Sequence, residues 1–234
     1  MFAPLEQVGR AEAVASRLVD AINLGLLADD EQLPSESELA AQFGVATVTI
    51  REALVALRHQ GLVETRRGRG GGSFVRAPSP ASPASWHARL KAVSLSDLRD
   101  VGDHYIAIAG AAAKLAAERS SPEDIERLRL ATEDLRTATA AEAARAERYF
   151  HLEVAAAAQS PRLTHQEVQL QSEGGGLLWL PLGVQESHEQ AYAEHLAITA
   201  AIAGADGEAA RRLTEEHILG ALDRLAEAHL GLVR

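Results

Sequence analysis

Residues 33–75, LPSESELAAQFGVATVTIREALVALRHQGLVETRRGRGGGSFV, decide the fold of the first part of this chain. Ser35 and Glu38 have the spacing of a capping box, so we expect a helix to begin there. Gly44 is expected to end that helix, because glycine tolerates a positive φ. Thr47 is expected to cap a second helix, which runs to the next glycine. Two short helices joined by such a turn predict a helix-turn-helix.

A two-stranded ribbon is expected after the second helix. Residues 62–65 and 73–75 have the composition of short strands. The glycine-rich turn between them carries Arg66, Arg67 and Arg69. Arginines on such a turn can approach a phosphate backbone without side-chain clashes, although many arginine-rich turns are simply solvated. The spacing therefore leaves DNA binding and an ordinary cationic surface turn both open.

Separated blocks of this part resemble the winged-helix domain of GntR-type bacterial transcription regulators. The blocks are LPSESELAAQFGV, TVTIREAL, LVALRHQGLV and GRGGGSFV, and the similarity extends from about Val14 to Val75. The resemblance implies a homodimer that binds a palindromic operator in double-stranded DNA. It also implies that Arg51 and Thr49 are recognition-helix contacts and that Gly70 is the wing glycine near the minor groove.

Two departures from the GntR pattern affect the expected DNA contacts. The family usually has an arginine where this chain has Ser37, and Ser-Arg where this chain has Ala46-Thr47. Because arginine is the commonest reader of guanine, we expect a non-standard operator or more reliance on Arg51 and the wing. The full candidate DNA-binding set is Ser35, Ser37, Thr47, Thr49, Arg51, Arg66, Arg67, Arg69 and Gly70.

Composition limits the classes of protein to which the chain can belong. It has 234 residues, 47% of them hydrophobic, only 4% aromatic, and no cysteine. The absence of cysteine excludes disulfides, thiol nucleophiles and thiolate metal sites, and it suits a reducing cytoplasm. No apolar run is long enough to span a bilayer, and the first residues lack the pattern of a signal peptide. We therefore expect a cytoplasmic protein without a membrane partner.

The net charge of −10 does not argue against a nucleic-acid partner. Residues 1–77 contain 8 Lys+Arg and 10 Asp+Glu, whereas the remainder contains 15 and 23. The acidic excess therefore lies mainly in the second part, and the position of the basic patch matters more than the total.

A proline-rich segment divides the chain. Residues 78–85 read PSPASPAS, which prevents a helix and favours an extended linker. We expect a winged helix-turn-helix domain at 1–77, a linker at 78–90, and an all-helical domain at 91–234. The second domain is expected to be an antiparallel helical bundle, so the chain as a whole is mainly α. Its expected helices are 96–119 with Ser96 as cap, one beginning at Ser121-Pro122, 140–159, 162–171, 185–203 and 206–230, with a loop and an apolar plug at 173–183.

Three histidines and a glutamate of the second domain have spacing that would bring them together. Glu147 and His151 are four residues apart, on one face of one helix. His195 and His217 lie on either side of the turn at Gly204-Ala205, at similar heights in an antiparallel pair. These side chains could hold a divalent cation such as zinc, nickel or manganese. Solvated or hydrogen-bonded histidines are the alternative that spacing leaves open.

The second domain is similar to the all-helical FCD effector domain of the FadR subfamily. The similarity covers about residues 95–230 and is carried by YFHLEVAAAAQSPRL and HLAITAAIAGADGEAARRLTEEHI. It implies a metal bound by Glu147, His151, His195 and His217, with a glutamate in place of the family's usual aspartate. Such a metal commonly captures a carboxylate effector, because it acts as a Lewis acid toward the ligand's oxygens.

The effector pocket is expected to depart from the family pattern. Tyr105, or its neighbour His104, stands where the family often has an arginine. Without that arginine, the pocket lacks a bidentate clamp for a carboxylate. We therefore expect either a less anionic effector or compensation by Arg148 or Arg162. Trp179 is expected in the core or in the pocket wall.

The sequence is compatible with three functions to different degrees. The first is a ligand-responsive repressor that binds its operator as a dimer and responds to a small organic acid. The second is a regulator that senses the metal with no organic effector. The third is a metal-dependent hydrolase, which is disfavoured because the chain has no nucleophile elbow, phosphate loop or metalloprotease helix. We therefore expect the protein not to be an enzyme.

Overall fold

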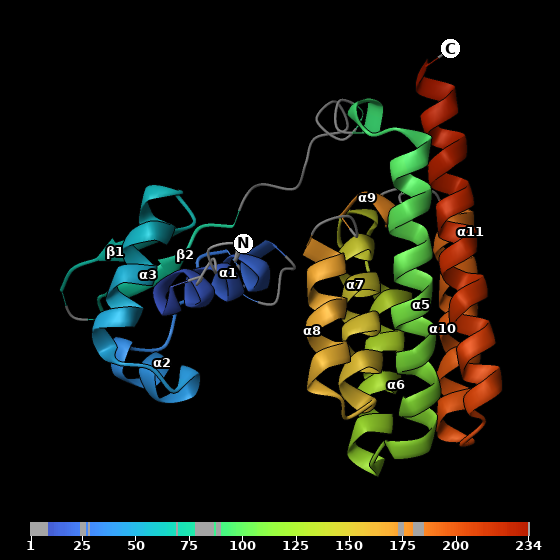
Figure 1. Ribbon diagram of the computed structural model, residues 1–234, viewed down its shortest axis with the longest axis horizontal. Coiled ribbons are helices and arrows are strands. Elements are labelled where there is room, and N and C mark those ends of the chain that lie inside the picture. Colours follow the sequence, from blue (N-terminus) through green and yellow to red (C-terminus); the bar gives the residue numbers. More distant parts are fainter. Residues whose placement is uncertain are drawn as a thin grey trace, which may run out of the picture. The chain divides into compact units, whose positions relative to one another are not determined.

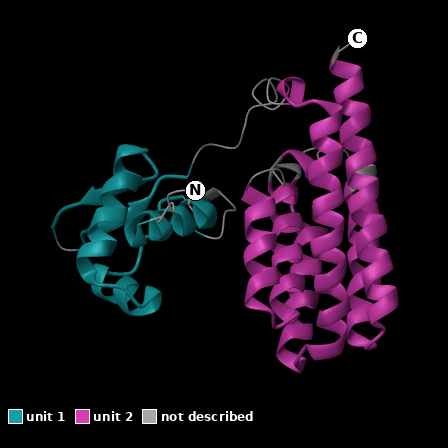
Figure 2. Cartoon of the chain, viewed as in Figure 1, with its two compact units in different colours: residues 1–79 teal, residues 80–234 magenta. Residues whose placement is uncertain are grey.

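The computed structural model describes residues 9–23, 27, 29–68, 70–77, 87, 90–172, 176–179 and 185–233. The chain divides into two compact units, Met1–Ser79 (unit 1) and Pro80–Arg234 (unit 2), coloured separately in Figure 2. Of the expected linker at 78–90, only residues 87 and 90 are among those described. No single described helix has both the length and the apolar character needed to cross a bilayer.

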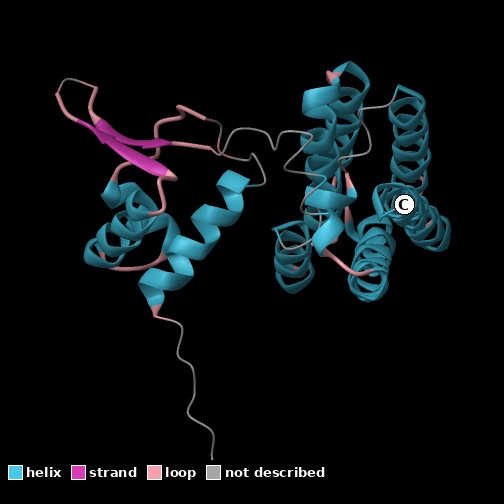
Figure 3. Cartoon of the chain, turned by 90° about the horizontal axis from the view of Figure 1, so that it is seen from above, coloured by secondary structure: helices cyan, strands magenta, loops and turns pink. Residues whose placement is uncertain are grey.

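Unit 1 consists of helices followed by a hairpin, as the sequence predicts. The helices are α1 (Arg10–Asn23), α2 (Glu36–Phe43) and α3 (Thr47–His59), and the strands are β1 (Val63–Arg66) and β2 (Gly72–Val75). The strands are antiparallel, with Val63 opposite Val75 and Arg66 opposite Gly72. Gln32 adds an isolated bridge to Phe74, which ties the segment before α2 to the ribbon. Figure 3 shows the two strands as the magenta hairpin of this unit.

The turn between α2 and α3 is built from local signals. Ser35 and Glu38 form the expected capping box, and Gly44 ends α2 with φ 64°. The expected cap at Thr47 is wrong, since Ala46 precedes the first helical turn and makes no side-chain hydrogen bond. Ala46 is extended, and its carbonyl accepts a hydrogen bond from the Thr49 amide at 3.0 Å. Thr47 is therefore already the first residue of the helix.

The core of unit 1 holds α3 against α1. Ile50, Leu54 and Leu57 repeat at helical spacing and are almost completely buried. They belong to one apolar cluster with residues of α1 and of the ribbon, among them Leu18 and Val75. Burial of this stripe leaves the opposite face of α3 at the surface.

Among its described residues, unit 2 contains helices and their connections but no strand, and Figure 1 shows its long helices running side by side. The small residues Ala109, Ala112 and Ala116 of the first long helix are buried, and that helix packs extensively against the last one. A Cβ at Gly102 would lie 2.5 Å from a methyl carbon of Leu222, so this glycine permits close approach. The helices are α5 (Leu95–Arg119), α6 (Pro122–Thr137), α7 (Ala140–Ala157), α8 (Pro161–Leu170), α9 (Gly176–Leu178), α10 (Gln185–Ala203) and α11 (Gly207–Val233).

Capping boxes begin α5 and α6. The expected cap of α5 at Ser96 is wrong: the Ser94 hydroxyl accepts from the Asp97 amide, and the Asp97 carboxylate accepts from the Ser94 amide. Ser96 lies inside the first turn, so its side chain cannot serve as the cap. Ser121 and Asp124 make the same reciprocal pair at α6, with a proline at the first helical turn as expected.

The apolar segment expected between α8 and α10 is buried where the structure describes it. Leu177, Leu178 and Trp179 are all buried, and residues 176–178 form one short helical turn instead of an irregular loop. The remainder of that expected loop, 173–175 and 180–183, lies outside the described residues. This turn places an indole ring inside the bundle.

Candidate metal centre and nucleic-acid interface

Three helices of unit 2 bring together the four side chains that the sequence singles out. Glu147 and His151 lie on α7, His195 on α10 and His217 on α11. One ligand atom from each residue lies within 4.8 Å of the others. From Oε2 of Glu147, the distances are 3.0 Å to His195 Nε2, 3.4 Å to His217 Nε2 and 3.6 Å to His151 Nε2. We call these four residues the Glu/His cluster.

The Glu/His cluster is buried and its polar atoms are unsatisfied. All four residues are at most 2% exposed. Both carboxylate oxygens of Glu147 and the Nε2 atoms of the three histidines lack a hydrogen-bond partner among the described residues. Leaving such groups buried and unpaired is costly, and the groups point toward a common centre. A nitrogen-rich set with one carboxylate fits zinc, nickel or manganese, and the longer Glu147 side chain still reaches the three rings.

Burial and charge shift the pKa values within the cluster in different directions. Burial lowers the pKa of His217, but the carboxylates of Glu147 and Glu194 outweigh it and raise the value to about 9. Burial lowers the pKa of His151 to about 4. Burial would raise the pKa of Glu147, yet His195 and His217 hold it well below its usual value. Without a cation, the cluster therefore holds a proton on His217, and a bound metal would displace that proton.

Glu194 is a contact that the sequence interpretation overlooked. Its Oε2 lies 2.6 Å from His217 Nδ1, so the protonated Nδ1 donates to the carboxylate and Nε2 faces the cluster. Glu194 precedes His195 on α10. Because the two residues are adjacent, Glu194 lies at nearly the same height as His195 in the antiparallel pair of α10 and α11.

Aromatic rings cover the sides of the cluster. Trp179 stacks on His151 with ring centroids 4.9 Å apart and on His217 at 5.3 Å. Phe150 stacks on His195 at 3.7 Å. Tyr105 meets the rings of His151 and Trp179 edge-on, at 5.9 Å and 6.2 Å. The predicted pocket residues Tyr105 and Trp179 therefore lie directly beside the cluster.

A closed polar network holds Tyr105 in place. Its hydroxyl donates to Glu167 Oε1 at 2.8 Å and accepts a hydrogen bond from Gln171. Gln171 also donates to Glu167 at 2.9 Å and accepts from Trp179 Nε1 at 3.1 Å. Burial raises the pKa of Glu167 to about 7. The sequence interpretation missed Glu167 and Gln171, although their spacing of four residues places them on one helix face.

The other predicted effector residues lie differently. His104 is exposed on α5, and Arg162 is exposed on α8. Arg148 is partly buried, its Nε has no hydrogen-bond partner among the described residues, and burial lowers its pKa. None of these side chains belongs to the Glu/His cluster.

In unit 1, Arg51 lies on the exposed face of α3, which is the second helix of the helix-turn-helix. Its side chain is 63% exposed, and its guanidinium pairs with Glu36 at 2.8 Å. Thr47 is exposed and Thr49 is partly buried on the same helix. The Ser35 hydroxyl is engaged at the start of α2, and Ser37 Oγ lies 3.0 Å from it.

The hairpin is less cationic than its arginine content indicates. Arg66 packs over the Phe74 ring at 4.1 Å and pairs with Glu64 at 2.7 Å and with Asp30. Asp30 comes from the segment before α2, so a count of charges along the hairpin could not include it. Arg67 and Gly70 are exposed, and Gly70 has φ 81°. Arg69 lies outside the described residues.

Known protein families and individual known proteins are similar in sequence to both units. The profile of bacterial regulatory proteins of the gntR family matches residues 10–72, and the FCD domain profile matches residues 100–220. The HTH-type transcriptional regulator named RmpR of Mycobacterium gastri is 42% identical, covering 99% of this chain and 86% of that protein. An L-lactate dehydrogenase operon regulatory protein of Escherichia coli (strain K12) is 30% identical, covering 89% and 83%.

A solved structure shares the fold. That of E. coli McbR/YncC has a TM-score of 0.53 and 19% identity, covering 94% of this chain and 99% of that chain. With both profiles matched and one relative similar along almost the whole length, the chain belongs to the gntR family of bacterial regulatory proteins, carries an FCD domain, and is a DNA-binding transcription regulator and not an enzyme.

Proposed function

We propose that this chain is a ligand-responsive repressor of the FadR subfamily that acts in the cytoplasm. A homodimer binds a palindromic operator through unit 1, and unit 2 binds a metal and a small organic acid. The observation that carries the proposal is the buried, unpartnered Glu/His cluster in the same chain as a gntR-type helix-turn-helix.

For DNA binding, we propose that α3 enters the major groove and that the hairpin contacts the backbone. Arg51 is exposed at the surface of α3, and its partner Glu36 is itself partly exposed, so DNA can replace that ion pair. Arg67 and Gly70 are exposed at the tip of the hairpin. Ser37 offers a hydroxyl where the family pattern has an arginine, so we expect fewer guanine contacts than in a typical operator.

For effector binding, we propose that Glu147, His151, His195 and His217 hold a divalent zinc, nickel or manganese ion. Such an ion supplies Lewis acidity toward a carboxylate oxygen. Glu194 keeps His217 Nε2 directed into the cluster, at 2.6 Å from the opposite ring nitrogen. By linkage, the effector and the operator change each other's affinity by the same factor.

A second candidate is a regulator that responds to the metal alone. The observation that favours it is the aromatic covering of the cluster, with Trp179 stacked on two of the three histidines. Tyr105, one of the two residues expected at the position of the family's arginine clamp, is hydrogen-bonded to Glu167 and Gln171. This version requires no organic ligand.

Fluorescence anisotropy with a labelled fragment of the gene's own upstream region tests the proposal. The metal-free protein, the protein reloaded with single cations, and the reloaded protein with a panel of organic acids are titrated at moderate salt. We expect specific binding that an acid weakens only when metal is present. Affinity that follows the metal alone would favour the second candidate, and the absence of specific binding in every state would reject both.

A further inference from the structure

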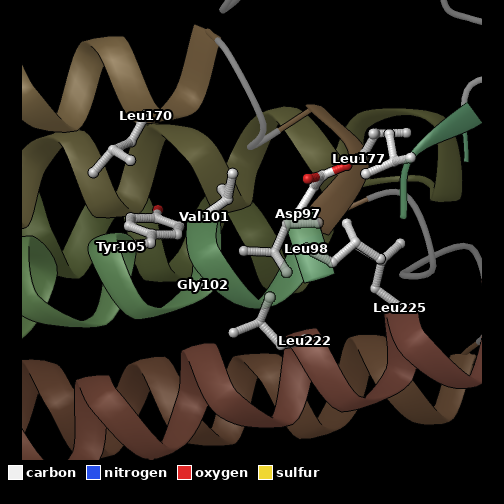
Figure 4. Close-up of a pocket in the computed structure, with 11 residues that line it drawn as sticks. Asp97, Leu98, Val101, Gly102, Tyr105, Leu170, Leu177, Leu222 and Leu225 are labelled. Atoms are coloured by element: carbon white, nitrogen blue, oxygen red, sulfur yellow. The ribbon is translucent and has the colours of Figure 1, made fainter. Parts of the chain in front are cut away.

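An apolar pocket opens in unit 2 beside the Glu/His cluster. It has a volume of about 180 Å³ and is walled by α5, α8, α9 and α11. Figure 4 shows Leu98, Val101, Leu177, Leu222 and Leu225 gathered around this space. Asp97 is the charged residue of the lining, and its carboxylate already accepts a hydrogen bond from the Ser94 amide at 3.3 Å.

This apolar pocket and the Glu/His cluster share one aromatic neighbour, Tyr105. Tyr105 lines the pocket and meets the His151 ring edge-on at 5.9 Å. Leu177 and Leu178 line the pocket, and the next residue, Trp179, stacks on His151. A molecule in the pocket would therefore contact Tyr105, one of the aromatic side chains beside the cluster, and the two residues that precede Trp179.

We propose that this pocket binds a compact apolar group, either the hydrocarbon end of the organic acid or a separate uncharged molecule. The described lining includes no lysine, arginine or histidine, so it provides no cation for a carboxylate. An apolar cavity of about 150 Å³ accommodates benzene, so this volume suits a ring or a branched chain of about six carbons. Sugar acids and other polyhydroxylated ligands are disfavoured, because their hydroxyls would be buried without partners. The first alternative rests on the function proposed above, whereas the second does not.

Calorimetry on the full-length, metal-loaded protein with straight-chain carboxylates from acetate to octanoate tests the hydrocarbon end. Each added methylene should improve affinity by about fourfold until the pocket is full, because each buries a similar apolar area. Toluene, titrated with and without metal, tests the uncharged molecule. Affinity that is flat along the carboxylates together with absence of toluene binding would overturn the proposal.

Filling the pocket provides the matched comparison. Val101 lines the pocket and is 40% exposed, so Val101→Trp can fill the space without disturbing the core. Leu130 is 57% exposed on α6 and does not line the pocket, so Leu130→Trp is the control. Val101→Trp should abolish the dependence on chain length and the binding of toluene, while Leu130→Trp keeps both. Unchanged ligand binding in Val101→Trp would contradict the assignment.

The two proposals fail in different ways. Metal titration and operator binding are measured on the same preparations. If the unmodified protein binds toluene but does not bind metal, or does not bind the operator, the proposed function is rejected and the pocket assignment stands. If the unmodified protein binds metal and operator, but shows no dependence on carboxylate chain length and no toluene binding, the pocket assignment is rejected and the proposed function stands.

Discussion

For single residues, the pair of Glu194 and His217 is the most informative. The carboxylate lies 2.6 Å from Nδ1 of a ring whose Nε2 faces the Glu/His cluster, so it sets the tautomer. We predict that Glu194→Gln lowers metal affinity by about 10- to 100-fold, since outer-shell partners of ligating histidines have effects of that size. Competition with a chelator of known affinity measures this. Glu216→Gln is the control, because Glu216 is an exposed partner of Arg212, and equal affinities for both variants would contradict the assigned role.

Glu167 gives a pH-dependent prediction. Its pKa is raised from 4.5 to about 7 by burial, so between these values the folded state holds a proton that the unfolded state has released. The contribution to stability is full below pH 4.5 and is lost as the pH rises to 7. Its size is on the order of 3 kcal/mol, from the shift in pKa. We predict that Glu167→Gln, which keeps the shape, removes this part of the pH dependence in urea unfolding.

The comparison must isolate this group, because other carboxylates titrate in the same range. The difference in unfolding free energy between the original protein and Glu167→Gln is therefore followed from pH 4.5 to 7. Glu123→Gln, at an exposed position in the first turn of α6, is the control for replacing an exposed carboxylate. Parallel curves for Glu167→Gln would show that its carboxyl is not raised in pKa.

Among the elements, the hairpin carries two kinds of arginine: one that is already paired with carboxylates and one that is available to DNA. Arg66 is paired with Asp30 and Glu64, whereas Arg67 is exposed next to it. We predict that Arg67→Ala reduces the slope of log affinity against log salt by about 1, as expected for one lost phosphate contact. Anisotropy at several salt concentrations measures the slope. Arg129→Ala, an exposed substitution in unit 2, is the control and should leave the slope unchanged. An unchanged slope in Arg67→Ala would contradict a phosphate contact by this residue of the hairpin.

The start of α5 provides a second prediction for an element. Ser94 and Asp97 form the capping box, and Ser96 lies within the first turn. Ser94→Ala should lower the unfolding free energy of unit 2 by about 1 kcal/mol, because a capping hydrogen bond is lost. Ser96→Ala should change it by less than about 0.5 kcal/mol, as at ordinary surface positions. Urea unfolding followed by circular dichroism distinguishes them, and equal effects would contradict the cap.

For the molecule as a whole, metal removal should destabilise one unit and not the other. The Glu/His cluster joins α7, α10 and α11 of unit 2. A metal that binds only the folded state adds about 2.7 kcal/mol at a concentration of 100 times Kd. We predict that chelation lowers the melting temperature of unit 2 in calorimetry and leaves that of unit 1 unchanged. Identical thermograms with and without metal would mean that the cluster binds no cation.

Patterns along the chain were sufficient to predict most of the elements. Spacing marked His151, His195 and His217 as candidates for one cluster without deciding whether they meet. Capping boxes, helix-ending glycines and helical periodicity act over a few residues, so α2, α3, α6 and the hairpin follow from local sequence. The two errors at helix starts, Thr47 and Ser96, are shifts by one or two residues between neighbouring candidates. The resemblance to known regulators supplied the function that periodicity left open.

Contacts between segments far apart in the chain required the folded arrangement. Asp30 reaches Arg66 across 36 residues, and Tyr105 reaches Glu167 across 62. Such pairs depend on how helices pack and on which way each side chain turns, and no local pattern contains that information. For the same reason, the burial that raises the pKa of Glu167 and the apolar pocket beside Tyr105 appear only when the helices are assembled.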